Sequence, residues 1–321
     1  MAGAITVCRK ELADHLGSKR YIVLFALILV LSTLSAYQGA EYIKDNPQAG
    51  FIAVFSGARF GFSFTSLMVF FGPIIGLSLG FDAINKERTS GSLSMLLSQP
   101  IYRDSVINGK FLAGTAALSL LTVTTIGIMS GVAMSILGFG PTLDDASRII
   151  LFTLLTILYL AFWLALGLLY STVTKKTSTS ILMSVATWLF FSIVIAIIAA
   201  LVANLLVPIT MPRDTSGGNI AKILQSPEFR ELLRRRFSIQ MNIQRVSPSY
   251  LYNEAGASIL GMSEGRLGFI GPGGGRPFKS LELIEGLTAS WPQITAIAAG
   301  LVICFVASYV LFLRLEIRPG G

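Results

Sequence analysis

Long apolar blocks separated by short polar stretches dominate the chain. Each block is about twenty residues long, the length that crosses the hydrocarbon core of a bilayer as an α-helix. The short segments of alternating polarity that are typical of a membrane β-barrel are missing. The pattern therefore predicts an all-α membrane protein with six transmembrane helices, over residues 20–37, 61–82, 106–138, 148–172, 179–207 and 291–313.

The polar segments on either side of the first span differ in character. Residues 4–18 place Ile5, Cys8 and Leu12 on one helical face, with charged side chains on the other. Such a helix lies flat in the membrane interface. We expect residues 38–60 to form a short connection between the first two spans.

The segment 208–290, between the fifth and sixth spans, carries its own helix signals. Ser-Pro pairs at 226–227 and 247–248 are typical helix starts, and an apolar stripe follows each of them. A third short amphipathic piece covers 280–287. We expect amphipathic helices that lie on the outer membrane face and partly dip into it.

Composition agrees with a membrane protein. The 321 residues are 53% hydrophobic and 13% charged, and the mean hydropathy is +0.70. A soluble domain would carry about 25% charged residues. The net charge of +8 fits basic anchors at helix ends. The basic cluster 234–236 has no aromatic stacking platform beside it, so we expect contact with anionic lipid headgroups or an acidic partner, and no nucleic acid.

The basic residues also predict the orientation. With a cytoplasmic N-terminus, most Lys and Arg of the short loops fall inside, in the segments 1–20, 83–105, 173–178 and 314–321. Long loops such as 208–290 are largely exempt from this rule. We therefore expect both termini in the cytoplasm of a multi-pass protein of the cell membrane. The apolar stretch after the basic N-terminus is too long for a cleavable signal peptide.

The sequence contains few residues that could form a catalytic or metal-binding site. The chain has one histidine, His15, and two cysteines, Cys8 and Cys304, far apart in sequence. The GLSLG segment, 76–80, resembles a nucleophile elbow but lies inside an apolar span. The segment 271–280 is rich in glycine, yet phenylalanine precedes its Lys-Ser pair, whereas a phosphate loop requires glycine there. We expect no catalytic, cofactor-binding or metal-binding residues on this chain.

The second span has small and polar positions that could face a partner. Glycines four residues apart allow two helices to approach closely in lipid, and hydroxyl side chains give the same span a polar edge. A substrate pathway or dimer face is one interpretation; packing within one subunit and bonds to the local backbone are the others. The residues are Ser63, Thr65, Ser66, Gly72, Gly76, Ser78 and Gly80.

The cytoplasmic segment 81–110 carries the most specific pattern. Ser90 is placed to cap a short helix over about 89–99, whose apolar face holds three leucines and which Pro100 ends. A short exposed helix with an apolar face is suited to a groove on another protein. Packing against the protein's own bundle is the alternative.

This segment resembles the ABC-2 type permeases, the membrane subunits of a large class of ABC exporters. The family pattern E-R-x-x-G-T-L-E-x-L-L-S-x-P-[IV]-x-R is followed by G-K at the third span. This chain departs from the pattern at Ser92 and Ser94. It matches the pattern at Glu87, Arg88, Gly91, Leu93, Leu96, Leu97, Ser98, Pro100, Ile101, Arg103, Gly109 and Lys110.

The resemblance covers essentially the whole chain and implies a single transmembrane domain, 1–321. The segment 247–255, S-P-S-Y-L-Y-N-E-A, is similar to an outer segment of such permeases. Among these permeases, the chain most resembles the six-span types for nitrous-oxide-reductase maturation and for sodium or antibiotic efflux.

The resemblance also implies a mechanism. Two permease subunits, most simply a homodimer, pair in the membrane, and two ATP-binding subunits dock below them and carry ATP and Mg²⁺. The helix at about 89–99 acts as a coupling helix, and the turn with Lys175 and Lys176 is the second contact. The implied ATPase interface comprises Glu87, Arg88, Gly91, Leu93, Leu96, Leu97, Pro100, Arg103, Lys175 and Lys176.

Two other functions stay open at this point. The chain could be a membrane scaffold that transmits motion to an extracellular protein docked on 208–290. It could also be an ion-coupled carrier, although the apolar centres of the spans hold no ionisable side chain, which disfavours that class.

Overall fold

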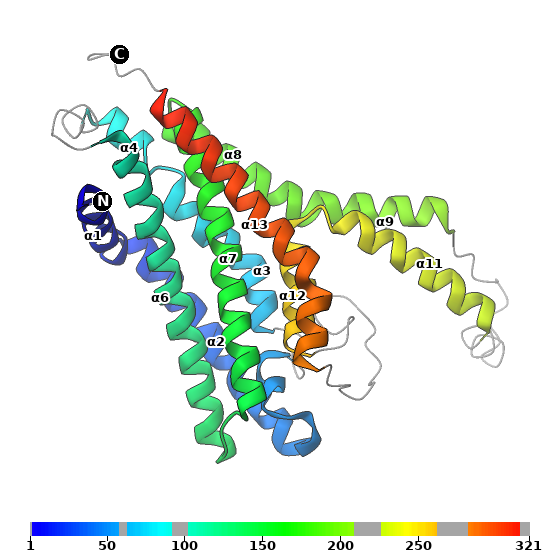
Figure 1. Ribbon diagram of the computed structural model, residues 1–321. Helices are drawn as coiled ribbons and strands as arrows, with labels where there is room; N and C mark the ends of the chain where they lie inside the picture. The colour runs from blue at the N-terminus through cyan, green and yellow to red at the C-terminus, as the bar shows by residue number, and fades with distance from the viewer. Residues whose placement is uncertain (1, 58–62, 92–101, 209–225, 262–281, 315–321) are drawn as a thin grey trace. The chain divides into compact units, whose positions relative to one another are not determined.

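The computed structural model describes residues 2–57, 63–91, 102–208, 226–261 and 282–314, and every structural statement below concerns these residues. They form two compact units (Figure 1). The first combines Met1–Ala186 with Leu251–Gly321, and the second is Thr187–Tyr250. We describe each unit by itself.

The described elements are all helical, and none of these residues lies in a strand. Six helical stretches are long and apolar enough to cross a membrane, which confirms the predicted fold class. The elements are α1 (Ala2–Leu16), α2 (Lys19–Asp45), η1 (Pro47–Ala49), η2 (Phe51–Phe55), α3 (Phe64–Gly80), α4 (Asn85–Thr89), α6 (Arg103–Leu137), α7 (Leu143–Val173), α8 (Thr177–Leu189), η3 (Phe190–Val194), α9 (Ile195–Leu206), α11 (Pro227–Gln244), α12 (Pro248–Ile259) and α13 (Leu283–Leu313).

Polar side chains fix where several helices begin. Ser63 caps α3 by accepting a hydrogen bond from the backbone N–H of Ser66. Thr142 and Asp145 form a reciprocal capping box at the start of α7. Ser226 caps α11, with proline in the first turn. The helix start predicted at the first Ser-Pro pair is therefore confirmed.

Helix α7 lies at the centre of the first unit, where it contacts α3, α6 and α13 (Figure 1). Its largest side chains, Trp163, Tyr159 and Phe152, are fully buried. The ring of Tyr252, from α12, stacks on Tyr159 with centroids 4.3 Å apart. Its hydroxyl lies 3.0 Å from that of Thr156. This aromatic cluster joins α12 to the bundle of the first unit.

Helix α12 differs from the predicted surface helix. It starts at Pro248 as the sequence indicates, but its later side chains, including Tyr252 and Ala255, are buried. Arg148 of α7 donates to the carbonyl oxygen of Ile259 at 3.2 Å and so satisfies the carboxyl end of α12. The apolar stripe of α12 therefore packs into the core of the first unit and is not the exposed face of a surface helix.

Two predicted boundaries also change. Helix α2 continues to Asp45 because Gly39 lets its last turns pack directly on the backbone of Val54 in η2. Of the short piece predicted at 280–287, residues 283–287 form the beginning of α13, which runs through Pro292. A side chain at Gly286 would collide with the carbonyl of Ser258, so glycine permits these first turns to pack against α12.

The second unit contains the end of one candidate span and the next described helix, α11. α8, the π-helical turn η3 and α9 form one continuous apolar stretch, Thr177–Leu206. Helix α11 returns alongside α9 (Figure 1). No residue of α11 is fully buried, so this pairing is much more open than the core of the first unit.

Candidate functional site

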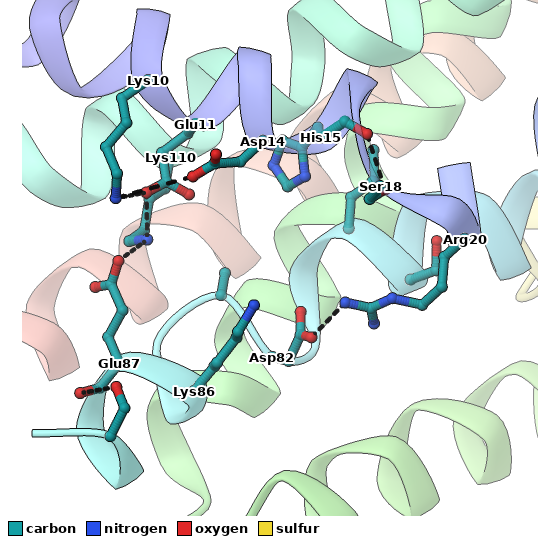
Figure 2. A pocket seen from close by; sticks show the side chains of 14 residues that line it. Lys10, Glu11, Asp14, His15, Ser18, Arg20, Asp82, Lys86, Glu87 and Lys110 are labelled. Atoms are coloured by element: carbon teal, nitrogen blue, oxygen red, sulfur yellow. Dashed lines mark hydrogen bonds and ion pairs between the residues drawn. The ribbon is translucent and has the colours of Figure 1, made fainter. Parts of the chain in front are cut away.

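Three charged side chains from separate helices meet at one end of the first unit. Lys110 Nζ of α6 lies 2.7 Å from Glu87 Oε1 of α4 and 3.1 Å from Glu11 Oε1 of α1 (Figure 2). The lysine side chain is only 4% exposed. A buried ammonium is tolerated when carboxylates neutralise it, and losing either side of such a pair is costly. We call Lys110, Glu11 and Glu87 the charged triad.

The residue before this lysine brings the triad together. A side chain at Gly109 would collide with Val7 and with the carbonyl of Ala4, both in α1. Glycine therefore lets α1 lie directly against α6, which places Glu11 beside Lys110. The Gly-Lys pair of the family pattern thus has two separate roles, a close helix contact and a buried countercharge.

The electrostatics of α1 reflect this packing. Burial alone would raise the pKa of Glu11, but the adjacent Lys110 ammonium, with a smaller contribution from Lys10, brings that pKa below its ordinary value. Burial lowers the pKa of His15, against the opposing attraction of Glu11. At neutral pH Glu11 is therefore ionised and the nearby His15 imidazole is neutral.

A polar pocket of about 260 Å³ lies next to the triad, between α1, α2, α3, α4 and α6 (Figure 2). On its far side Arg20 donates to Asp82 Oδ2 at 2.7 Å and lies over the ring of Phe81. No group of three His, Cys, Asp or Glu side chains that could hold a metal occurs among the described residues. Opposite charges balance across the pocket, an arrangement that fits a structural junction between helices.

Asn85 forms a second junction on the same segment. It is completely buried. When its amide nitrogen faces the carbonyl oxygens of Thr174 and Ser171, at 2.6 and 3.1 Å, its own oxygen lies 2.8 Å from the Thr174 hydroxyl. The Ser171 hydroxyl accepts from the backbone N–H groups of Ile84 and Asn85, at 2.9 and 3.1 Å. The segment after α3 is therefore bound to the end of α7.

The start of α8 adds one more bond to this junction. The Ser180 hydroxyl donates to the carbonyl oxygen of Phe81 at 2.7 Å. Between the two anchoring points the turn exposes Lys175 and Lys176. The two segments predicted to contact the ATPase, after the second and fourth spans, thus belong to one hydrogen-bonded assembly.

Several residues of the predicted ATPase interface can be placed. Glu87 points inward to the triad, and Arg88 lies in α4 and is partly exposed. Gly91 is exposed and has a positive φ of 72°, a backbone conformation that favours glycine. Arg103 begins α6. Leu93, Leu96, Leu97 and Pro100 lie outside the described residues.

Ser90 follows the last residue of α4, with backbone angles in the right-handed helical region. Its hydroxyl donates back to the carbonyl oxygen of Glu87 at 3.3 Å. The helix predicted over about 89–99, whose start Ser90 is predicted to cap, lies mostly outside the described residues, so this capping role stays a prediction.

The glycines of the predicted pathway or dimer face line a contact within the chain. A side chain at Gly72 would meet Tyr159 and Leu160, and Gly76 and Gly80 lie equally close to the next turns of α7. Within this chain the row therefore forms the seam between α3 and α7.

The hydroxyl residues of the predicted pathway or dimer face have different surroundings. Ser63 caps α3, and its hydroxyl lies 2.8 Å from that of Ser66. Thr65 is fully buried. Ser78 donates to the Ile75 carbonyl and lines the polar pocket. GLSLG is thus part of a continuous helix, whereas a nucleophile elbow needs a strand–turn–helix geometry.

Sequence reasoning missed Asn85 and the role of Glu11. An uncharged amide among charged neighbours, in the run N-K-E-R, is the only local hint of the first. A glutamate on a predicted interfacial helix gives no hint of the second, because its partner lies about a hundred positions away.

The amino-acid sequence is similar to those of known membrane permeases. The family profile described as "ABC-2 family transporter protein" matches residues 5–317. The chain is 32% identical over 204 residues to the probable ABC transporter permease protein NosY of Pseudomonas aeruginosa, covering 62% of this chain and 71% of that protein. It is also 32% identical over 121 residues to the protein of the same name from Stutzerimonas stutzeri, covering 38% and 42%. The chain therefore belongs to the ABC-2 transporter family, as a multi-pass membrane permease.

Proposed function

We propose that this chain is the permease subunit of an ATP-driven exporter. ABC permeases in general work with an ATP-binding subunit. In this proposal two permease copies pair, two ATPase subunits dock at the cytoplasmic end, and ATP with Mg²⁺ binds only on the ATPase. Family membership supports the general role, and the two junctions described above support the coupling.

The observation that carries the proposal is the Asn85 junction. It binds the segment that precedes the expected coupling helix to the exposed turn holding Lys175 and Lys176. A force applied at either segment therefore reaches α7 directly. Through Lys110 the same segment is also bound to α1 and α6. Closure of an ATPase dimer would thus move these helices together.

Removing the Asn85 side chain tests the coupling. We expect Asn85→Ala to retain the ATPase subunit in the purified complex but to lose most of the stimulation of ATP hydrolysis. The exposed Asn242→Ala, in the second unit, serves as the matched control and should behave like the unmodified protein. Normal stimulation in a stable, folded Asn85→Ala complex would refute the coupling role.

Docking is tested separately. The coupling helix of the proposal uses Leu93, Leu96 and Leu97 as its apolar face. Replacing all three by alanine should abolish co-purification with the ATPase subunit. If both binding and stimulation stay intact, the ATPase contacts another part of the chain.

Orientation has its own test, because the proposal places both termini in the cytoplasm. Positions 143 and 175 flank the two ends of α7, and both are exposed. In a background without Cys8 and Cys304, an impermeant thiol reagent applied to intact cells should label Leu143→Cys and leave Lys175→Cys unmodified. The reverse labelling would invert the proposed topology.

A further inference from the structure

The second unit contains a groove that the coupling proposal does not use. It lies between Val207, just after α9, and residues 227–239 of α11, and has a volume of about 820 Å³. The groove combines an apolar floor, from Val207 and Ile239, with a charged wall that α11 supplies.

The charged wall is predominantly basic. Arg230 and Arg234 are exposed side chains one helical turn apart, and no described carboxylate pairs with either of them. The third arginine of the wall, Arg235, is neutralised by Glu231 at 2.9 Å. The guanidinium group presents a planar set of donors that matches the oxygens of a phosphate. The groove therefore has two guanidinium groups available for an anion.

The position of the groove along the chain indicates the source of that anion. Val207 follows directly on the candidate span Thr177–Leu206. The last residues of that span, Leu205 and Leu206, are 81% and 64% exposed in this chain. Apolar side chains at the end of a span contact lipid, so the groove lies at the level where the hydrocarbon ends and the headgroups begin.

Helix α11 has the character of an interfacial helix. Leu232 and Phe237 are 42% and 53% exposed, and the exposed Arg230 and Arg234 lie on the same helix. Such helices insert apolar side chains at the headgroup boundary and attract anionic lipids through their basic residues. An acidic protein partner would fit the arginines, but it gives no reason for the exposed apolar side chains beside them.

We propose that this groove binds the phosphate of an anionic phospholipid, with Arg230 and Arg234 as the phosphate ligands. The apolar floor from Val207 and Ile239 then contacts the upper part of the acyl chains. The site is independent of the ATPase-coupling proposal, because none of its residues belongs to the charged triad or to the Asn85 junction.

The test uses the full-length protein in nanodiscs that contain phosphatidylcholine and a minor fraction of phosphatidylglycerol, and it measures retained lipid by native mass spectrometry. We expect Arg230→Gln/Arg234→Gln to reduce retention of phosphatidylglycerol roughly 30-fold, since each basic residue near an anionic membrane contributes roughly a fivefold factor. Arg230→Lys/Arg234→Lys should keep most of the binding, because an ammonium also attracts phosphate.

The control removes the same charge from α11 and its C-cap residue. Arg236→Gln/Arg245→Gln removes two arginines that do not line the groove, so retention should change less than twofold. Equal losses in the two double variants would overturn the proposal, since the attraction would then be a property of net charge. The proposal also fails if the lipid is absent from the unmodified protein, or if a soluble acidic peptide displaces it while phosphatidylglycerol in excess does not restore it. In nanodiscs of phosphatidylcholine alone, Arg230→Gln/Arg234→Gln should stimulate the ATPase subunit as much as the unmodified protein does.

Discussion

The α3–α7 seam and the α9–α11 pairing show two different uses of apolar helices. In the most apolar window of α7, 61% of the residues are buried within the chain, whereas the span that ends in α9 buries only 17%. Both helices are rich in aliphatic residues. What distinguishes them is the row of glycines on α3, which lets two backbones meet. Hydropathy indicates that a helix enters lipid, and small residues decide which helices touch.

The largest expected effect comes from filling the tight seam. Gly80→Val would place a side chain 2.6 Å from the Leu164 carbonyl oxygen and 2.8 Å from the Leu168 nitrogen, both backbone atoms that cannot move aside. We expect a loss of about 3 kcal/mol in the free energy of unfolding, measured as a lower thermal midpoint in detergent. Gly131→Val is the matched control, since nothing lies within 4 Å of that position. Similar tolerance at both sites would show that the seam is loose.

The next effect concerns the charged triad, which joins α1 to the same unit. Lys110→Met leaves the largely buried Glu11 and Glu87, whose side chains are 12% and 13% exposed, without their countercharge, and we expect a loss of about 2 kcal/mol. Replacing both glutamates by glutamine in the same variant should recover much of that loss. Lys10→Met, at a side chain that is 59% exposed, should leave the thermal midpoint nearly unchanged. If the triple variant is no more stable than Lys110→Met alone, the two unpaired carboxylates are not the cause of the lost stability.

A smaller effect depends on pH. Because the pKa of Glu11 is lowered in the folded protein, its ionised form stabilises the fold above the ordinary value of 4.5, and this contribution is lost as the pH falls through the lowered pKa. We expect Glu11→Gln to cost about 1.5 kcal/mol near neutral pH, and the difference from the unmodified protein to shrink below pH 4.5. Thermal midpoints across this range measure it. The exposed Asp14→Asn should show little difference at any pH; a gap for Glu11→Gln that widens in acid would contradict the assignment.

The smallest effect on stability is expected in the α9–α11 pairing. Arg235 and Glu231 form an ion pair on α11 with side chains that are 70% and 64% exposed. Such pairs contribute little because water screens them. We expect Arg235→Gln to change the free energy of unfolding by less than about 0.5 kcal/mol, as judged by the thermal midpoint. A larger loss would mean that the second unit is better packed than its exposure indicates.

Much of the architecture could be predicted from the sequence. Span length, the absence of charge in the span centres and the Ser-Pro helix starts are local properties, so they can be recognised without a partner. The burial of α12 and the continuation of α13 through Pro292 could not be predicted in this way. Both depend on contacts with a distant helix: Tyr252 stacks on α7, and Gly286 lies against the end of α12.

The candidate site divides in the same manner. The chain by itself determined that Glu87 and the Gly-Lys pair belong to one motif and that six helices enter the membrane. Only the tertiary structure decided that Glu87 faces Lys110 and Glu11, that Asn85 holds the end of α7, and that the glycine row meets α7. A helical period tells which residues share a face, but the partner of that face is set by close packing and by the need to neutralise buried charge.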